Sequence, residues 1–365
     1  MSQEIVANLF NVRSHNPSFF SVKQNLGYAG ELLDFCIPVN LHFPPAELVQ
    51  LIHEQLPEIL RYYPDYAEVH QRAIAEMTGL APETIVPCNG STEIITRLCQ
   101  QTNGPILTSI PTFSRWTDLP HELELPIHTI RRKREKNFQL EVEEVISRVR
   151  EVEARTLVIS NPNNPTGAWF TLSQILEMTN ALRDLDSIII DESFIDFSDL
   201  ESAGPYVEDF PNLVVVKSMG KSFGWHGVRL GYAVSGRESA NQLRAGLPFW
   251  NINGLAAFVL KSVTRYRVEY LESFTKVAED REYMKQQLSQ LKELMVYPSK
   301  SNFLFVELTE RISGRQLRDR LLTNHGVMVR ECSNKLGSSE QFLRLAVQKK
   351  DAVDTLISAL REELT

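Results

Sequence analysis

The sequence predicts an α/β protein whose central sheet is mostly parallel and lies between layers of helices. Between about residues 45 and 245, segments with apolar residues at helical spacing alternate with short apolar segments. The short segments are continuously apolar, which is typical of parallel strands covered on both faces. The chain has 365 residues, more than the roughly 250–300 that one hydrophobic core accommodates, so a second, smaller domain is expected.

Two helices open this region, "ELVQLIHEQLPEILRYY" and "YAEVHQRAIAEMTG", and Gly79 is placed to end the second. Strands are expected at residues 84–88, 105–110, 156–160, 187–191, 213–218 and 230–236. After about residue 254, a long helical stretch leads into a mixed region that contains "SNFLFVELT" and "QFLRLAVQ". We therefore expect a large domain at residues 45–250. A smaller α+β domain is expected from residues 251–365, joined by an N-terminal arm of residues 1–44.

The amino-acid composition argues against some classes of binding partner. A formal net charge of −8 argues against nucleic acid or an anionic membrane as the main partner. The sequence contains no run of 18 apolar residues, and its first residues lack the pattern of a signal peptide. The four cysteines lack the spacing of a metal site and suit a reducing compartment. A cytoplasmic protein without a metal site is expected.

Unusual polar residues follow four of the expected strands, and ligands of open parallel sheets collect at the carboxyl ends of strands. In "CNGSTEIITRL", Ser91 and Thr92 open a helix whose free first-turn amides suit an anion. The same residues also suit an ordinary helix cap that Glu93 closes. In "SNPNNPTGAWF", the rigid context of Asn164 suits a hydrogen bond to a fixed ligand atom.

The other two strand ends carry charged residues. Asp191 ends the apolar strand "SIIID", where a buried carboxylate needs a cationic partner or a capping role. The segment "KSMGKSFGWHGVRLGY" places Ser218, Lys221 and Arg229 around three glycines. Ser218 and Arg229 suit a phosphate, and Lys221 suits an imine. Together, the four strand ends describe a pocket for pyridoxal 5'-phosphate.

On these motifs, above all "NPNNPTG" and the serine, lysine and arginine that follow the 213–218 strand, the chain resembles the class I/II aminotransferase superfamily. These are pyridoxal phosphate enzymes of fold type I, and the resemblance covers nearly the whole chain. It implies that Lys221 forms the internal aldimine and shuttles the proton at the substrate α-carbon. It also implies that Asp191 keeps the pyridine nitrogen protonated and that Asn164 bonds the ring 3-hydroxyl. The implied phosphate ligands are Ser91, Thr92, Ser218 and Arg229.

The resemblance implies further residues around the ring and the substrate. Phe113 is expected to stack on the ring, with Trp116 nearby in the substrate pocket. Arg344, in "FLRLAV", matches the arginine that binds the substrate α-carboxylate. Tyr63, in "RYYPDY", matches a tyrosine that reaches the phosphate of the neighbouring subunit, so a homodimer is expected.

Within the superfamily, "RYYPD", "PFWNINGLAA" and "FLRLAV" look like the histidinol-phosphate aminotransferase and threonine-phosphate decarboxylase branch. Arg330 matches a substrate-binding arginine of the decarboxylase, and Phe194 stands where the aminotransferases carry a tyrosine. Other features depart from the branch. Only Asn40 remains of the substrate loop, His226 replaces a small residue near the lysine, and "VANLF" lacks residues that hold the decarboxylase's substrate phosphate. These departures predict a polar or basic amino acid rather than a phosphate monoester.

Amino transfer on an α-amino acid is the main expectation for the reaction, and three alternatives stay open. One is decarboxylation of an amino-acid phosphate. Another is elimination and cyclisation of a hydroxylated arginine, as in capreomycidine-synthase-like cyclases, which the rebuilt loop 38–42 and His226 would suit. His226 equally suits a structural histidine. The third is a regulatory protein that has lost catalysis, against which the intact residues argue: Lys221, Asp191, Asn164 and Arg229.

Overall fold

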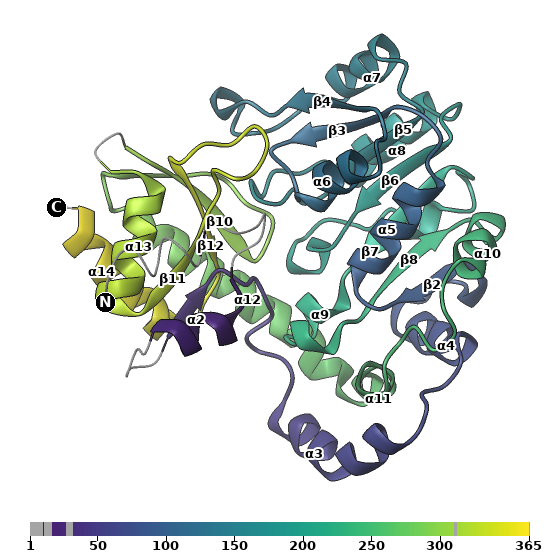
Figure 1. Cartoon of the computed structure of the whole chain (residues 1–365), viewed down its shortest axis with the longest axis horizontal. Helices are drawn as coiled ribbons and strands as arrows, with labels where there is room; N and C mark the ends of the chain where they lie inside the picture. Colours follow the sequence, from purple (N-terminus) through teal and green to yellow (C-terminus); the bar gives the residue numbers. More distant parts are fainter. Residues whose placement is uncertain (1–9, 11–16, 27–31, 310–311, 365) are drawn as a thin grey trace.

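The computed structural model describes residues 10, 17–26, 32–309 and 312–364, and it contains two sheets that lie side by side (Figure 1). Apart from Phe10, the segment "VANLF" lies outside the described residues. Within the described ranges, no helix is both long enough and apolar enough to cross a membrane.

The large sheet is mostly parallel, as the sequence predicts. Its strand order is β2 (Ile85–Cys88), β8 (Gly231–Ser235), β7 (Leu213–Lys217), β6 (Ser187–Asp191), β5 (Thr156–Ser160), β3 (Ile106–Ile110) and β4 (Ile127–Arg131). Only β8 runs antiparallel to its neighbours. Each expected strand is present to within one residue at either end. β4 was not expected, because its sequence "IHTIR" is polar and this edge strand is only partly buried.

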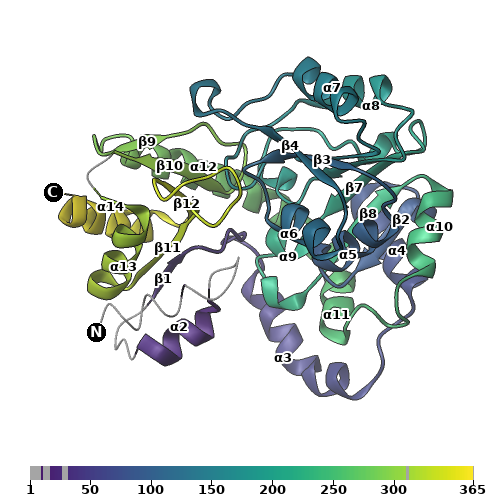
Figure 2. The same ribbon diagram turned by 45° about the horizontal axis from the view of Figure 1, so that its top comes forward.

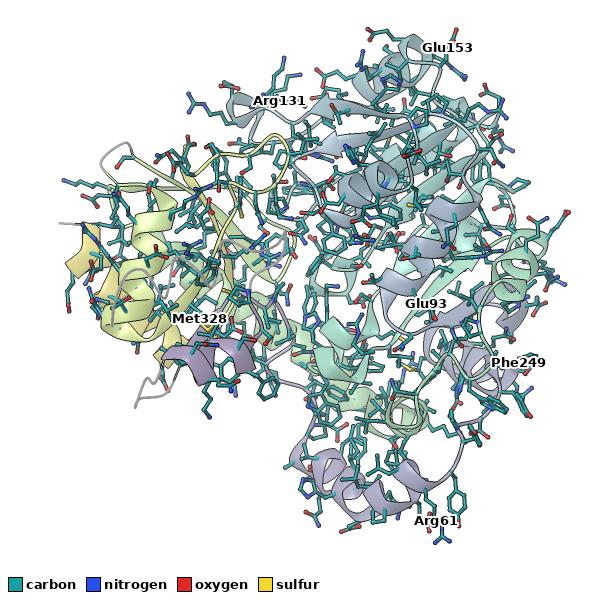
Figure 3. The ribbon with its side chains drawn as sticks, viewed as in Figure 1. Arg61, Glu93, Arg131, Glu153, Phe249 and Met328 are labelled. Carbon is teal, nitrogen blue, oxygen red and sulfur yellow. The ribbon has the colours of Figure 1, made fainter. Side chains whose placement is uncertain are left out.

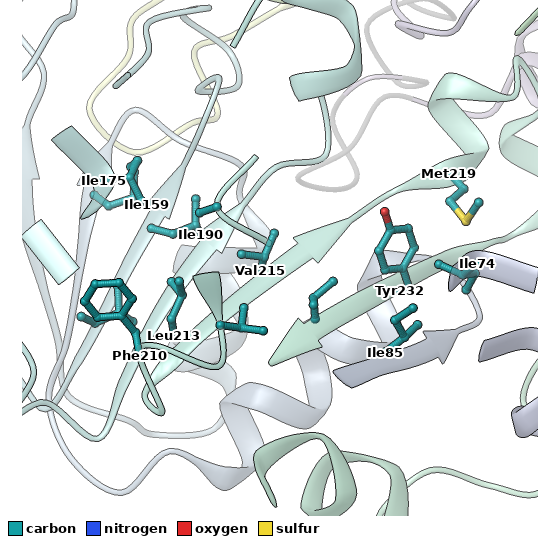
Figure 4. Close-up of a cluster of buried hydrophobic side chains, with 14 of the residues drawn as sticks. Ile74, Ile85, Ile159, Ile175, Ile190, Phe210, Leu213, Val215, Met219 and Tyr232 are labelled. Atoms are coloured by element: carbon teal, nitrogen blue, oxygen red, sulfur yellow. The ribbon is translucent and has the colours of Figure 1, made fainter. Parts of the chain in front are cut away.

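Alternate residues of these strands face two separate apolar layers. Ile188 and Ile190 of β6 face one layer, formed with α4 (Ala67–Thr78), α7 (Val142–Glu151), α8 (Leu172–Ala181) and α11 (Gly254–Val263). Figure 4 shows Ile190 of this layer beside residues of neighbouring strands and of α8. Ile189 faces the other layer, formed with α5 (Ser91–Gln101), α6 (Arg115–Glu122) and α10 (Arg237–Ala245). This alternation is why the sheet is covered on both faces.

The smaller sheet has the order β1 (Leu33–Phe35), β11 (Val327–Glu331), β12 (Phe342–Ala346), β10 (Phe303–Leu308) and β9 (Leu294–Val296). β1 is parallel to β11, and the other pairs are antiparallel. The remaining core of this part comes from α12 (Arg267–Leu288), α13 (Gly314–His325) and α14 (Lys350–Leu364). Figure 2 shows α13 and α14 on the outer side of this sheet, away from the large sheet. The domain boundaries drawn from the sequence stay a prediction.

The described residues include three further helices: α2 (Phe19–Leu26) before β1, α3 (Ala46–Arg61) between β1 and α4, and the single turn α9 (Met219–Ser222) between β7 and β8. The helical stretch expected after residue 254 is divided, because a 3-10 turn at Thr264–Tyr266 separates α11 from α12. Gly79 ends α4 with a φ of 76°, in the left-handed region where glycine is favoured.

Candidate active site

A cavity of about 400 Å³ lies where the carboxyl ends of the central strands meet the smaller sheet. Ten of the residues singled out from the sequence line it: Ser91, Thr92, Phe113, Asn164, Ser218, Lys221, His226, Arg229, Arg330 and Arg344. Phe194, which marks the branch, also lines the cavity. The fold therefore brings together residues that lie up to about 250 positions apart in the sequence.

One end of the cavity is built from the start of α5. Gly90 precedes the helix with a φ of 72°, and no side chain caps the helix. Glu93 accepts a hydrogen bond from the backbone N–H of Asn89 at 2.7 Å. Because no side chain caps the helix in return, the capping box that the sequence allowed does not form. A side chain on Gly90 would clash with the guanidinium of Arg229. Glycine here allows Arg229 to lie against the turn, and the pair forms a cationic cradle for an anion.

Lys221 lies in α9, directly after β7. Its Nζ donates to Oγ of Ser218 at 2.8 Å and lies 4.9 Å from the ring centroid of Phe194. Burial lowers the pKa of Lys221 to about 8, and the charges of Arg229 and Arg344 act in the same direction, although Asp191 opposes them. An amine with a lowered pKa is neutral, and therefore nucleophilic, closer to neutral pH.

Asp191 ends β6 and is only 2% exposed. Its Oδ1 accepts the backbone N–H of Ser193 at 3.0 Å, and its Oδ2 accepts Nε1–H of Trp116 at 2.7 Å. Trp116 is buried and does not line the cavity. Asp191 is not among the lining residues either, and the indole contacts it through the bond to Oδ2. The expected place of Trp116 in the substrate pocket stays a prediction.

Arg344, on β12, is joined to the loop that follows β5. Its Nη1 donates to Oδ1 of Asn164 at 2.8 Å, and its Nη2 donates to the carbonyl of Cys36. Its Nε is buried without a hydrogen-bond partner. Burial lowers the pKa of Arg344 to about 10. Arg330, on β11, is its cross-strand partner, so two guanidinium groups enter the cavity from one sheet.

Lys335 also lines the cavity, although nothing in the sequence pointed to it. Its buried Nζ donates to the carbonyl of Thr112 at 3.1 Å and to Oγ of Ser114 at 3.3 Å. Burial lowers its pKa to about 7, and the charge of Arg330 adds to this effect. In the sequence, "SNKLG" looks like an ordinary solvated loop. The contacts that bury this lysine come from residues more than 200 positions earlier.

Asn40 does not line the cavity, so its expected contact with substrate is not supported. Its Nδ2 instead donates to the carbonyl of Ser222 at 3.0 Å and to Oγ of Ser273 at 2.7 Å. Its backbone N–H donates to the carbonyl of Lys221 at 2.9 Å. Asn40 therefore fastens the segment around residue 40 to α9 and α12.

His226 and Tyr63 have different positions. Burial, followed by the charge of Lys221, lowers the pKa of His226 to about 3, so a neutral imidazole faces the cavity. It also has a hydrogen bond with the backbone of Pro38. Tyr63 is 80% exposed and stacks on Trp250 at a centroid distance of 4.7 Å. Its expected role concerns a neighbouring subunit and stays a prediction.

The side chains present fit pyridoxal 5'-phosphate. The open amides of α5, three hydroxyl groups and Arg229 suit a phosphate monoester, and the amine of Lys221 suits an aldehyde. Asp191 supplies a buried carboxylate, and Arg344 leaves the amide nitrogen of Asn164 available as a donor. Phe113 adds an aromatic face to the wall.

Comparison with known proteins gives the family. The family model "Aminotransferase class I and II" matches residues 31–360. The chain belongs to this family. It is therefore a pyridoxal phosphate-dependent enzyme of fold type I, and the family, fold type and cofactor predicted from the sequence are confirmed.

Individual relatives of this enzyme also match the predicted branch. It is 28% identical over 367 residues to the L-serine phosphate decarboxylase of Campylobacter jejuni, covering 95% of this chain and 92% of that protein. It is 28% identical over 361 residues to the histidinol-phosphate aminotransferase of Caldanaerobacter subterraneus, covering 94% and 97%. The solved structure of a decarboxylase from Sulfurospirillum multivorans has a TM-score of 0.90 and 28% identity, covering 100% of this chain and 96% of that one.

Proposed function

We propose that this enzyme removes the α-carboxylate, as CO₂, from an α-amino acid whose side chain carries a phosphate group. The observation that carries the proposal is a wall with three cations, Arg330, Lys335 and Arg344, beyond the end that suits the cofactor phosphate. Of the described residues that line the cavity, one is a carboxylate, Asp34, and its Oδ1 already accepts the backbone N–H of Cys36. One α-carboxylate would leave this wall with an excess of positive charge.

The three cations divide between two anions. Arg344 suits the α-carboxylate, because its contact with Asn164 places it beside the proposed ring site. Arg330 and Lys335 then remain for a group on the side chain. The charge of Arg330 helps to lower the pKa of Lys335, and a bound dianion would oppose this effect and favour the protonated lysine. A phosphate monoester carries this charge.

Decarboxylation is supported by Phe194 and by the relatives. Phe194 offers no hydroxyl where the aminotransferases of the branch carry a tyrosine, and the match to the L-serine phosphate decarboxylase spans nearly the whole chain. When bound, the cofactor supplies an electron sink for the electrons of the broken bond. The bond from the α-carbon to the carboxylate breaks, CO₂ leaves, and Lys221 delivers the proton that takes its place.

This proposal replaces the expectation of a polar or basic substrate, which rested on motifs absent from the sequence. The sequence did not place Lys335 in the cavity, where it adds a basic side chain to the wall. A hydroxylated arginine would bring its own guanidinium towards Arg330 and Lys335, where like charges repel.

The reaction can be tested with the holoenzyme and a substrate panel. The panel contains L-serine phosphate, L-threonine phosphate, histidinol phosphate, L-serine and L-arginine, each with and without 2-oxoglutarate, and products are identified by mass spectrometry. We expect a phosphorylated amino acid to lose CO₂ without a keto acid, with kcat/KM above about 10⁴ M⁻¹s⁻¹. Turnover that requires the keto acid would instead establish amino transfer, and turnover of L-arginine alone would refute the phosphate assignment.

Lys335 provides the sharper test of substrate class. Lys335→Gln should raise KM for the phosphorylated substrate by about 10- to 100-fold, because hydrogen bonds to charged groups contribute roughly 1.5–3 kcal/mol. Turnover of unphosphorylated L-serine should change little. Lys335→Arg should retain most of the affinity, and Lys300→Gln, at a surface ion pair with Asp199, is the matched control. Equal losses for phosphorylated and unphosphorylated substrates would contradict the assignment.

A homodimer remains part of the proposal. Tyr63 belongs to a cluster of exposed aromatic residues whose rings contact Trp250: Tyr63, Tyr66 and Phe249. Figure 3 places Phe249 on the side of the molecule away from Met328 of the smaller sheet. Exposed aromatic patches of this kind mark association surfaces. Sedimentation at assay concentration should give a dimer, and a fully active monomer would contradict this part of the proposal.

A further inference from the structure

The carboxylate of Asp191 is held from behind by a single side chain. Nε1–H of Trp116 donates to Oδ2 at 2.7 Å, while the backbone N–H of Ser193 donates to Oδ1 at 3.0 Å. The side chains of Asp191 and Trp116 are both buried, so water does not compete for these hydrogen bonds. A carboxylate offers about four lone-pair sites, which leaves acceptor capacity on both oxygens. Asp191 does not line the cavity itself, but its charge acts on Lys221, which does.

The chemistry of the indole matters here. An indole N–H donates and cannot accept, so it takes no proton from Asp191 and adds no charge of its own. A histidine could share the proton, and an arginine would compensate the negative charge. Trp116 therefore fixes the direction of the carboxylate and leaves its charge available to the cavity.

Packing keeps the indole in place. Trp116 belongs to the apolar layer that contains Ile95, Val158 and Ile189, so the ring has no open side into which it could turn. Its backbone N–H donates to the carbonyl of Phe113 at 2.9 Å. The same turn of chain therefore positions both Phe113, in the aromatic wall of the cavity, and the indole N–H of Trp116 that donates to Asp191.

We infer that Trp116 is a positioning residue that aims the charge of Asp191 at the ring nitrogen of the cofactor. The inference rests on the proposed placement of the cofactor, with Asp191 facing that nitrogen. Trp116 itself touches neither the cofactor nor the substrate.

Two substitutions separate the donor from the packing. Trp116→Phe keeps an aromatic ring and removes the N–H, whereas Trp116→His can place Nε2–H where Nε1–H lies and removes the six-membered ring. Trp116→Phe should weaken binding of pyridoxal phosphate to the apo-protein by about 10- to 100-fold, because a misdirected carboxylate loses its hydrogen bond to the charged ring nitrogen, and such bonds contribute roughly 1.5–3 kcal/mol. Trp116→His should recover much of that loss.

The absorbance of the bound cofactor gives a second readout. In Trp116→Phe, the pH midpoint of its visible absorbance change should move upward. A ring that is less firmly protonated withdraws fewer electrons from the nitrogen of Lys221, which then becomes more basic. A role in packing alone would not move this midpoint.

Leu119→Ala is the control for packing, because Leu119 is buried in the same layer and on the same helix as Trp116. It should lower thermal stability and leave cofactor affinity and the absorbance midpoint near wild-type values. In an Asp191→Ala background, Trp116→Phe should weaken cofactor binding by less than about a further threefold, because the hydrogen-bond acceptor is gone. The inference is overturned if the cofactor affinity of Trp116→Phe lies within about twofold of wild type or equals that of Leu119→Ala. It is also overturned if Trp116→Phe causes its full loss of affinity in the Asp191→Ala background.

All of these readouts are made without substrate, which separates the inference from the proposed function. If wild-type protein binds the cofactor and Trp116→Phe is unchanged, only the inference fails. If cofactor binding responds as expected and no phosphorylated amino acid is turned over, only the proposed function fails.

Discussion

The two ends of the active-site cavity differ in where their positive charge comes from. The end at α5 uses backbone amides, hydroxyl groups and one guanidinium, Arg229, which lies against Gly90. The wall from the smaller sheet uses buried side-chain cations, and the partners of Lys335 are a carbonyl and a hydroxyl rather than a carboxylate. Both ends suit anions, but they reach this property by different means.

This difference indicates which end of the cavity can determine substrate specificity. Backbone amides at a helix start are fixed by the fold and carry only partial charge. Buried cations are costly without an anion, and the lowered pKa values of Lys335, about 7, and Arg344, about 10, express this cost. Substitutions at the cofactor end and at its neighbour Lys221 should therefore reduce turnover of every substrate alike. Substitutions in the wall should instead reduce the affinity for substrate.

The largest effect is expected for Lys221→Ala. Turnover of every substrate should fall by about 10²- to 10⁴-fold or more, because the group that moves the α-proton is lost, and covalent attachment of the cofactor should disappear. Activity and the visible spectrum measure the two effects. Lys300→Ala, at an exposed ion pair, should leave both unchanged. Wild-type turnover in Lys221→Ala would refute the role of this lysine.

Asp191→Asn should have the next largest effect. Removing a preorganised charge should slow kcat by about 10²-fold, with KM changed much less, because the loss falls on the transition state. Asp186→Asn, at an exposed pair with Arg155, is the control. Steady-state kinetics distinguish the outcomes, since a rise in KM with unchanged kcat would place Asp191 in substrate binding instead.

Arg344→Lys tests the wall. An ammonium cannot reproduce a bidentate contact or retain the bond to Asn164, so KM should rise about tenfold or more for every α-amino acid, phosphorylated or not. Lys335→Gln, by contrast, should discriminate between these classes. If Arg344→Lys instead affected only phosphorylated substrates, the assignment of the two anions to the wall would have to be exchanged.

The pH dependence of cofactor attachment gives the smallest effect. Because burial lowers the pKa of Lys221 to about 8, the neutral amine should increase about tenfold between pH 7 and pH 9 and then level off. The rate at which apo-protein captures pyridoxal phosphate, followed by stopped-flow absorbance, should follow this fraction. A rate that still rises tenfold per pH unit above pH 9 would indicate an unperturbed lysine.

The sequence predicted the cofactor end well because its residues come in short contiguous motifs. Ser218, Lys221 and Arg229 lie within twelve residues after one strand, and strand ends of a parallel sheet meet at one edge. Local patterns also located the six strands to within a residue, whereas the polar edge strand β4 gave no such signal.

The remainder depends on contacts that a local pattern does not encode. Lys335 is buried and donates to Thr112 and Ser114, which lie more than 200 positions earlier in the sequence. Trp116 lies close to a recognised motif, but its hydrogen bond to Asp191 depends on packing in the apolar layer against the sheet, which no local pattern shows. Asn40 was recognised as part of a loop, and its contacts with Ser222 and Ser273 were not visible in the sequence.

The start of α5 has one more connection. Asn251 donates through Nδ2 to Oε2 of Glu93 at 2.8 Å and to the carbonyl of Pro87 at 3.2 Å. Its neighbour Trp250 stacks on exposed Tyr63. Whatever orders the segment around Trp250 therefore also orders the first turn of α5. If the proposed dimer forms through this face and thereby favours cofactor binding, thermodynamic reciprocity requires that the bound cofactor favour the dimer by the same factor. Dilution of the holoenzyme would then release cofactor, and excess cofactor would hold the subunits together.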